Sequence, residues 1–283
     1  MSQHRPSLDA FSGQLSDRAK SFFAREHIFR DLSNTCSFER LAEELDRRGA
    51  PWFDKVFELE EEFGGLVRRG PHPKTPSLAI GLFQLISLGF DAPGEEEPED
   101  DSALVSLKWP MVRLAATGDL LTHVGVYTTE ADLYLSESGW IFWYVSTLDR
   151  VELLSGSAST FLERVALEDH VRRTMREYAG TFFTADEGSA IAQALNIPVV
   201  EEASDALITH WMNPNLFISR LPRTSAPGIY RTRIVSRTVE ALLSAAQAVI
   251  TRSPEAQATV ETHLPGGRER HDALRREGVA VGG

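Results

Sequence analysis

The stretch FELEEEFGGL, residues 57–66, joins an acidic run to two glycines and then returns to apolar residues. Apolar side chains recur at helical spacing, at Val56, Leu59 and Phe63, so we predict an amphipathic helix that opens at Pro51. Glycine adopts positive φ readily, and Gly64-Gly65 therefore ends this helix. The alternative is a phosphate-binding loop, which would need a further glycine or a Lys-Ser/Thr pair and then a helix. A strand pattern follows here, so the glycine pair is interpreted as a helix terminator.

Two further helices are predicted before this stretch. Residues 8–29 place apolar side chains on one face of a long amphipathic helix. The segment SFERLAEELDRRG, residues 37–49, predicts a second helix with Ser37 as its N-cap and Gly49 as its stop. The first unit thus begins with helices.

The residues after Gly65 are β-branched, aromatic or alternating, and they predict a mostly antiparallel sheet. LSESGWIFWYV, residues 135–145, is typical of a hairpin with Ser138-Gly139 in its turn. A helix capped by Ser157 or Ser159 follows and closes the first unit.

A second unit follows, and it mixes both kinds of element. We expect a helix that ends near Asn196, a strand after Pro198, two strands around the turn at residues 212–215, and a strand that leads into a long helix capped by Ser236. A strand, a helix and a short final strand complete it. The predicted fold class is α+β: helices packed on a mostly antiparallel sheet, then a small α+β or α/β domain. The expected domains are a helical extension (1–36), an α+β domain (37–177) and a second small domain (178–283).

The composition limits the possible partners and the possible location of the protein. The 283 residues carry a net charge of −12, so the average surface repels nucleic acids and anionic membranes and attracts basic partners. Cys36 is the single cysteine, which fits a reducing compartment. Residues 76–90 are the longest nearly apolar stretch and are too short to span a membrane, which takes about 20 residues. No secretory signal pattern opens the chain, and a cytoplasmic location is expected.

No catalytic or metal-binding motif emerges from the sequence. The histidines lack metal-ligand spacing and no nucleophile motif occurs, so we expect no metal, no cofactor and no enzymatic activity. The enzyme alternative would place a site at His210 with Asp205 and Glu202 nearby, or at His271. A lone histidine on a strand is more often a packed residue. Residues 264–271, LPGGRERH, are either an anion-binding turn or a surface loop before a helix.

One low-complexity run, residues 91–101, is strongly acidic. It is either a solvated loop or a segment that attracts a basic partner. Clustered carboxylates can do the latter because they accelerate encounters with cationic molecules. Aromatic anchors inside a charged rim are typical of tight interfaces. The predicted partner-binding residues are therefore the acidic side chains of this run and one aromatic near it: Asp91, Glu95, Glu96, Glu97, Glu99, Asp100, Asp101 and Trp109.

Three segments between about Phe53 and Leu167 resemble the SUKH superfamily. They are the helix end FELEEEFGGL, the strand pair DLYLSESGWIFWY and the helix start SASTFLERVAL. The Leu-Pro pair that often precedes the glycine helix in this group is absent, although Pro51 stands nearby. The resemblance implies that the glycine pair lets the chain turn into the first strand of the sheet. It also implies an immunity protein, which neutralises a cognate bacterial toxin by binding it.

The expected function is therefore non-enzymatic, antitoxin-like occlusion of a basic toxin protein in bacterial competition, without nucleic acid or membrane partners. An adaptor or chaperone for a secreted effector is the alternative within the same class, because delivery needs the same complementary surface. The enzyme reading with a site in the second unit is the other alternative.

Overall fold

The computed structural model describes residues 15–30, 37–48, 53–68, 78–81, 111–113, 120–127, 131–145, 150–175, 179–223 and 226–282. The chain divides into two units, Met1–Phe161 and Leu162–Gly283, and each contains its own antiparallel sheet with helices. This confirms the α+β prediction. The domain boundary expected after residue 177 stays a prediction.

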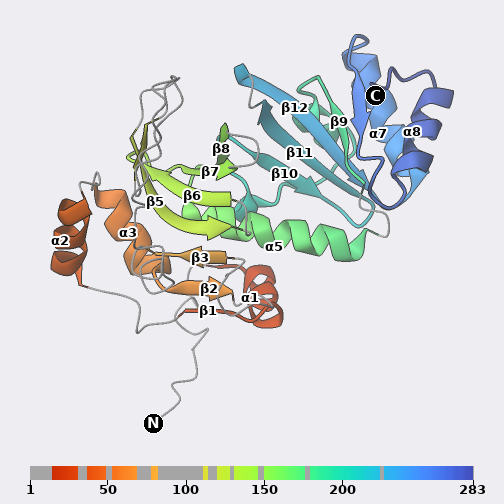
Figure 1. Ribbon diagram of the computed structural model, residues 1–283. Helices are drawn as coiled ribbons and strands as arrows, with labels where there is room; N and C mark the ends of the chain where they lie inside the picture. Colours follow the sequence, from red (N-terminus) through yellow and green to blue (C-terminus); the bar gives the residue numbers. More distant parts are fainter. Residues whose placement is uncertain are drawn as a thin grey trace. The chain divides into compact units, whose positions relative to one another are not determined.

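The first unit combines helices with a long sheet (Figure 1). Its described helices are α1 (Asp17–Arg25), α2 (Phe38–Arg48) and α3 (Asp54–Phe63). Its strands are β1 (Ile28–Arg30), β2 (Leu66–Arg68), β3 (Leu78–Ile80), β4 (Met111–Arg113), β5 (Leu120–Tyr127), β6 (Ala131–Ser136), β7 (Ile141–Val145) and β8 (Arg150–Ser155). The sheet order is β1-β2-β3-β5-β6-β7-β8, and β4 also pairs with β5.

The prediction of a single long helix over residues 8–29 is wrong at its C-terminal end. The helix α1 stops at Arg25, His27 takes a positive φ of 53°, and Ile28–Arg30 pairs with β2 as a strand. The apolar residues after Arg25 therefore lie in a sheet rather than along one face of a helix. Helical periodicity cannot anticipate this outcome, because the partner strand lies more than 35 residues later in the chain.

The glycine pair ends α3 as predicted. A Cβ on Gly64 would lie 2.3 Å from the carbonyl oxygen of Glu60, so the backbone of the last helical turn excludes any side chain there. Gly65 has a φ of 82°, and its N–H donates to the carbonyl of Ile80 in β3 at 3.0 Å. The chain thus leaves the helix and enters β2 without a loop.

Arg30 of β1 stabilises the same helix end. Its guanidinium donates to the carbonyl oxygens of Gly64 at 2.8 Å, Glu60 at 3.2 Å and Glu61 at 2.5 Å. A cation at a helix C-terminus complements both the unsatisfied carbonyls and the helix dipole. Burial lowers the pKa of Arg30, and the carboxylates of Glu60 and Glu61 act in the opposite direction.

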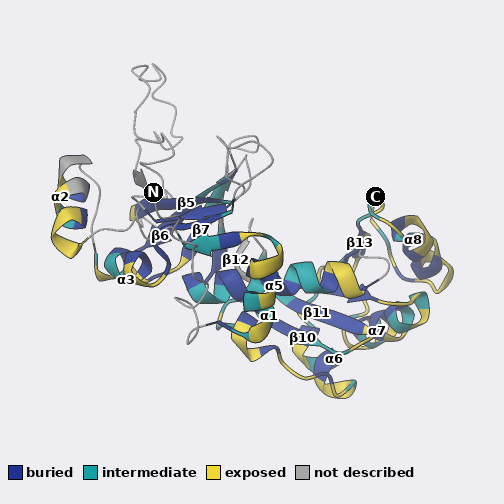
Figure 2. Cartoon of the chain, turned by 90° about the horizontal axis from the view of Figure 1, so that it is seen from below, coloured by how far each residue is buried: buried dark blue, intermediate teal, exposed yellow. Residues whose placement is uncertain are grey.

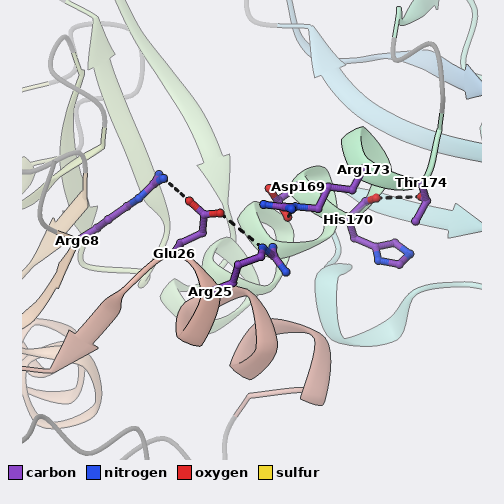
Figure 3. A network of polar contacts seen from close by, with 7 residues as sticks. All are labelled: Arg25, Glu26, Arg68, Asp169, His170, Arg173 and Thr174. Carbon is purple, nitrogen blue, oxygen red and sulfur yellow. Dashed lines mark hydrogen bonds and ion pairs between the residues drawn. The ribbon is translucent and has the colours of Figure 1, made fainter. Parts of the chain in front are cut away.

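A second polar link joins α1 to the sheet of the first unit. Glu26 pairs with Arg25 at 3.5 Å and with Arg68 of β2, as Figure 3 shows. These contacts hold the turn between α1 and β1 against the next strand.

The hairpin and the closing helix follow the sequence prediction. The strands β6 and β7 pair around a turn in which Gly139 has a φ of 85° and donates to the carbonyl of Ser136. The helix α5 (Ala158–Thr174) begins after Ser157, whose hydroxyl accepts from the N–H of Thr160 at 3.1 Å. The division between the two units falls within α5.

The second unit has a five-stranded sheet of order β10-β11-β12-β9-β13. Its strands are β9 (Thr181–Phe183), β10 (Thr209–Met212), β11 (Leu216–Arg223), β12 (Ala226–Ser236) and β13 (Ala258–Val260). The described helices are α6 (Gly188–Ala194), the short 3-10 helix η4 (Glu201–Ala203), α7 (Val239–Arg252) and α8 (Gly267–Arg276). Residues of α6, α7 and α8 pack on one face of the sheet in one core, and the C-terminal part of α5 packs on the other face in a second core. Figure 2 shows the resulting buried strands β10 and β11.

Three details of this unit differ from expectation. Thr238, not Ser236, caps α7: its hydroxyl accepts from the N–H of Ala241 at 3.2 Å, while Ser236 ends β12 with a buried side chain. The strand expected after Pro198 is only a single bridge from Val199 to Trp211, and the final strand only a bridge from Ala258 to Val281. Ser236 pairs with Leu216 as the last residue of β12, so the helix begins after it.

Candidate functional site

The predicted partner-binding residues lie outside the part of the chain that the structure describes. These are Asp91, Glu95, Glu96, Glu97, Glu99, Asp100, Asp101 and Trp109. Their role as contacts stays a prediction, and so does the electrostatic attraction of a basic partner by the acidic run. Cys36 also lies outside the described residues.

His210, the histidine of the enzyme alternative, is a packed residue. It is fully buried on β10, its Nδ1 lies 2.9 Å from the hydroxyl of Ser219, and its ring stacks on Phe217 at 5.4 Å. The neighbouring strands therefore fix its position, as expected for a lone histidine on a strand.

The other residues of that alternative have local roles. The carboxylate of Asp205 accepts from the N–H groups of Leu207 and Ile208, both at 2.8 Å, and so holds a turn before β10. Glu202 is exposed on η4. His271 lies on α8 and contacts its neighbour Asp272 at 3.2 Å. The histidine candidates thus occur on separate elements, with neighbours that explain their positions.

A different group of side chains stands out on the first unit, where aromatic residues are exposed. Phe38 opens α2 with 56% of its surface exposed, and its ring centroid lies 4.1 Å from that of Phe57 on α3. The two planes meet at 33°. This contact joins the start of α2 to the outer side of α3, where the sequence has no apolar stripe.

The hairpin turn between β6 and β7 also contacts α3, and an exposed aromatic residue follows that turn. Trp140 follows the turn between β6 and β7 and is 37% exposed. A Cβ on Gly139 would lie 3.2 Å from the Cδ of Lys55, so the turn rests against the first turn of α3. The backbone N–H of Trp140 donates to the hydroxyl of Ser136 at 3.2 Å, which fixes the turn.

Exposed carboxylates line α3. Along α3, the exposed acidic side chains are Asp54, Glu58, Glu61 and Glu62. Asp54 and Glu61 lie three residues before and four residues after Phe57, so all three share one side of the helix. Lys55 pairs with Glu58. We name the set of Phe38, Phe57, Trp140, Asp54, Glu58, Glu61 and Glu62 the α3 surface.

A further carboxylate lies beside Phe38. Glu39 is exposed in the first turn of α2, and its own backbone N–H, with a smaller contribution from the hydroxyl of Ser37, lowers its pKa. The side chain therefore stays ionised well below neutral pH. Exposed aromatic rings near acidic side chains can bury apolar area against a partner, while the acidic side chains attract its cations.

The sheet of the first unit also contains a buried polar group. His123 of β5 is 1% exposed, its Nε2 lies 3.4 Å from Asp132, and its ring lies 5.0 Å from that of Tyr134. Burial lowers the pKa of His123, with Asp132 opposing the shift, and burial raises the pKa of the Tyr134 phenol. The pairing of β5 with β6 shifts register next to this histidine.

Sequence reasoning missed the aromatic residues of the α3 surface. The available signal was the position of Phe57, which falls off the buried stripe of Val56, Leu59 and Phe63 and among glutamates. An aromatic residue on the acidic side of an amphipathic helix is a candidate contact residue. Nothing local indicates that Phe38 packs on Phe57 or that the hairpin turn before Trp140 contacts α3, because these residues belong to other elements.

Comparisons with family models, curated proteins and solved structures find no match for this chain. Within the described ranges, no three side chains of histidine, cysteine, aspartate or glutamate gather in a way that could hold a metal ion. Among the helices that the structure describes, none is long and apolar enough to cross a membrane.

Proposed function

We propose that this protein binds and occludes a basic bacterial toxin, as an immunity protein does. The observation that carries the proposal is the α3 surface, where the exposed or half-exposed aromatic residues Phe38, Phe57 and Trp140 occur on and beside an acidic helix. Aromatic residues and a polar rim are the usual anatomy of a protein interface. The resemblance of the first unit to the SUKH superfamily and the net charge of −12 point the same way.

The acidic charge of the α3 surface indicates which kind of partner it would bind. A toxin that acts on nucleic acid needs a basic active-site face, and carboxylates along α3 would complement such a face. Occlusion also explains why the surface needs no catalytic group: covering the toxin's substrate site is sufficient.

The test starts from the genes that flank the gene for this protein. Each product is expressed alone and together with this protein, and complex formation is measured by co-purification. The proposal predicts that one product is toxic alone, forms a stable complex with this protein and is inactive in that complex. A complex in which the partner keeps its full activity would instead establish the adaptor alternative. Absence of any toxic flanking product that binds this protein would contradict the proposal.

A further inference from the structure

A pocket of about 420 Å³ opens on the second unit and is separate from the α3 surface. Its described lining joins the end of α5 to the turn between β10 and β11 and to the end of β12: His170, Thr174, Met175, Met212, Asn213, Pro214 and Arg237. A volume of this size lies within the roughly 300–1,000 Å³ range of small-molecule sites.

The apolar part of the lining is adaptable. Met175 and Met212 are two of the four methionines in the chain, and with Pro214 they supply its apolar surface. Methionine is flexible and polarisable, which suits a wall that must accommodate an aliphatic or aromatic group.

The polar part contains oriented donors. Asn213 uses its Oδ1 to accept from the N–H groups of Asn215 at 2.9 Å and Leu216 at 2.8 Å, which fixes the orientation of its amide. Within the described part of the chain, the NH₂ of that amide and the guanidinium of Arg237 have no acceptor. His170 completes the lining, and Figure 3 shows its imidazole pointing away from the Asp169–Arg173 ion pair on the same helix.

The charge of the lining is the reverse of that of the whole chain. The protein has 41 acidic and 29 basic residues, yet none of the described residues that line this pocket is acidic. A cation and an amide donor beside an apolar wall complement an anion that carries an apolar tail.

We propose that this pocket binds a small carboxylic acid with an aliphatic or aromatic tail, with its carboxylate at Arg237 and Asn213 and its tail against Met175 and Met212. This site is independent of the α3 surface, so either proposal can fail without the other.

Binding can be measured by NMR at the methyl groups of Met175 and Met212. The full chain is labelled with ¹³C at the methionine methyl groups, and Met175 and Met212 are assigned through Met175→Leu and Met212→Leu. Hexanoate is titrated up to about 10 mM, tenfold above the millimolar Kd that so small a ligand reaches. We expect saturable shifts of the Met175 and Met212 signals, with Met111 of the other unit unchanged. Hexanamide, the neutral isostere, should bind at least about threefold more weakly, because it lacks the charge.

Two variants test the donors. Asn213→Asp keeps an oxygen for the Asn215 and Leu216 N–H groups but replaces the NH₂ with negative charge, and it should weaken hexanoate about tenfold or more. Arg237→Gln should weaken hexanoate binding about three- to tenfold, and Arg252→Gln, which removes the same charge from an exposed position at the end of α7, should not. The proposal is overturned if hexanoate leaves both methyl signals unshifted, if hexanamide binds equally well, or if Arg252→Gln matches Arg237→Gln. The comparison of the two ligands on the wild-type protein decides the matter even if a variant does not fold.

Discussion

Phe38 of α2 and Phe57 of α3 pack against each other in a tilted arrangement with ring centroids 4.1 Å apart, and Phe38 still exposes more than half of its surface. A ring that is held by a neighbouring ring and still exposed offers a preorganised apolar contact to a partner.

The first prediction concerns these aromatic side chains. Phe38→Ala and Trp140→Ala should each reduce affinity for the toxin about 10- to 30-fold, equivalent to about 1.4–2 kcal/mol at an interface hot spot. Thermal unfolding should shift little, because both side chains are substantially exposed. Titration calorimetry measures the affinity. Val199→Ala, a similarly exposed position in the second unit, is the control and should bind like the wild type.

The second prediction concerns the carboxylates of α3. The double variant Glu61→Lys/Glu62→Lys should slow association with a basic partner about tenfold at low salt, and the deficit should shrink as salt rises. Stopped-flow or biosensor kinetics at several salt concentrations measure this effect. Glu201→Lys/Glu202→Lys makes the same change in net charge on the second unit. An equal loss in that control would show that net charge, rather than the α3 surface, sets the rate.

The third prediction concerns the glycine turn. Gly64→Ala should destabilise the first unit by about 2–3 kcal/mol, because its Cβ would lie 2.3 Å from a backbone carbonyl that cannot move without breaking the last turn of α3. Gly278→Ala should cost only about 1 kcal/mol in the second unit, since its φ is 78° but nothing lies within 4 Å. Urea unfolding of both variants tests the pair, and a larger cost at Gly278 would contradict the steric explanation.

The fourth prediction concerns pH. His123 is buried, and this burial lowers its pKa. On acidification the unfolded chain therefore binds a proton at this histidine that the folded chain does not bind. Its contribution to stability is therefore complete above the unfolded pKa of about 6.5 and is lost as pH falls below it, by up to about 1.4 kcal/mol per pH unit. Urea unfolding between pH 5 and pH 8 should show this slope in the wild type and a smaller slope in His123→Gln. His263→Gln, at an exposed position, should keep the wild-type slope.

Features that depend on local chemistry are predictable from the sequence. Gly64-Gly65, the hairpin turn at Gly139 and the cap at Ser157 each follow from a residue's own conformational or hydrogen-bonding preference. Features that depend on distant partners are not. Ile28–Arg30 becomes a strand because β2 pairs with it, and β9 is only three residues long yet lies between β12 and β13.

The candidate site follows the same division. The acidic character of α3 is visible in the sequence, because four exposed carboxylates fall within the helix. The aromatic part is not visible, because Phe38, Phe57 and Trp140 come from three different elements: α2 packs on α3 through Phe38 and Phe57, and the hairpin turn before Trp140 contacts α3 at Lys55. Alternation and periodicity describe one element at a time and cannot assemble a surface of this kind.

The most direct test of the proposed function is survival of cells that express the toxic flanking gene together with this protein or its Phe38→Ser/Trp140→Ser variant, both at equal folded levels. Occlusion through the α3 surface predicts that the wild type restores growth and that the variant does not. Equal rescue by both proteins would contradict the α3 surface as the binding site, and failure of the wild type to restore growth would contradict immunity itself.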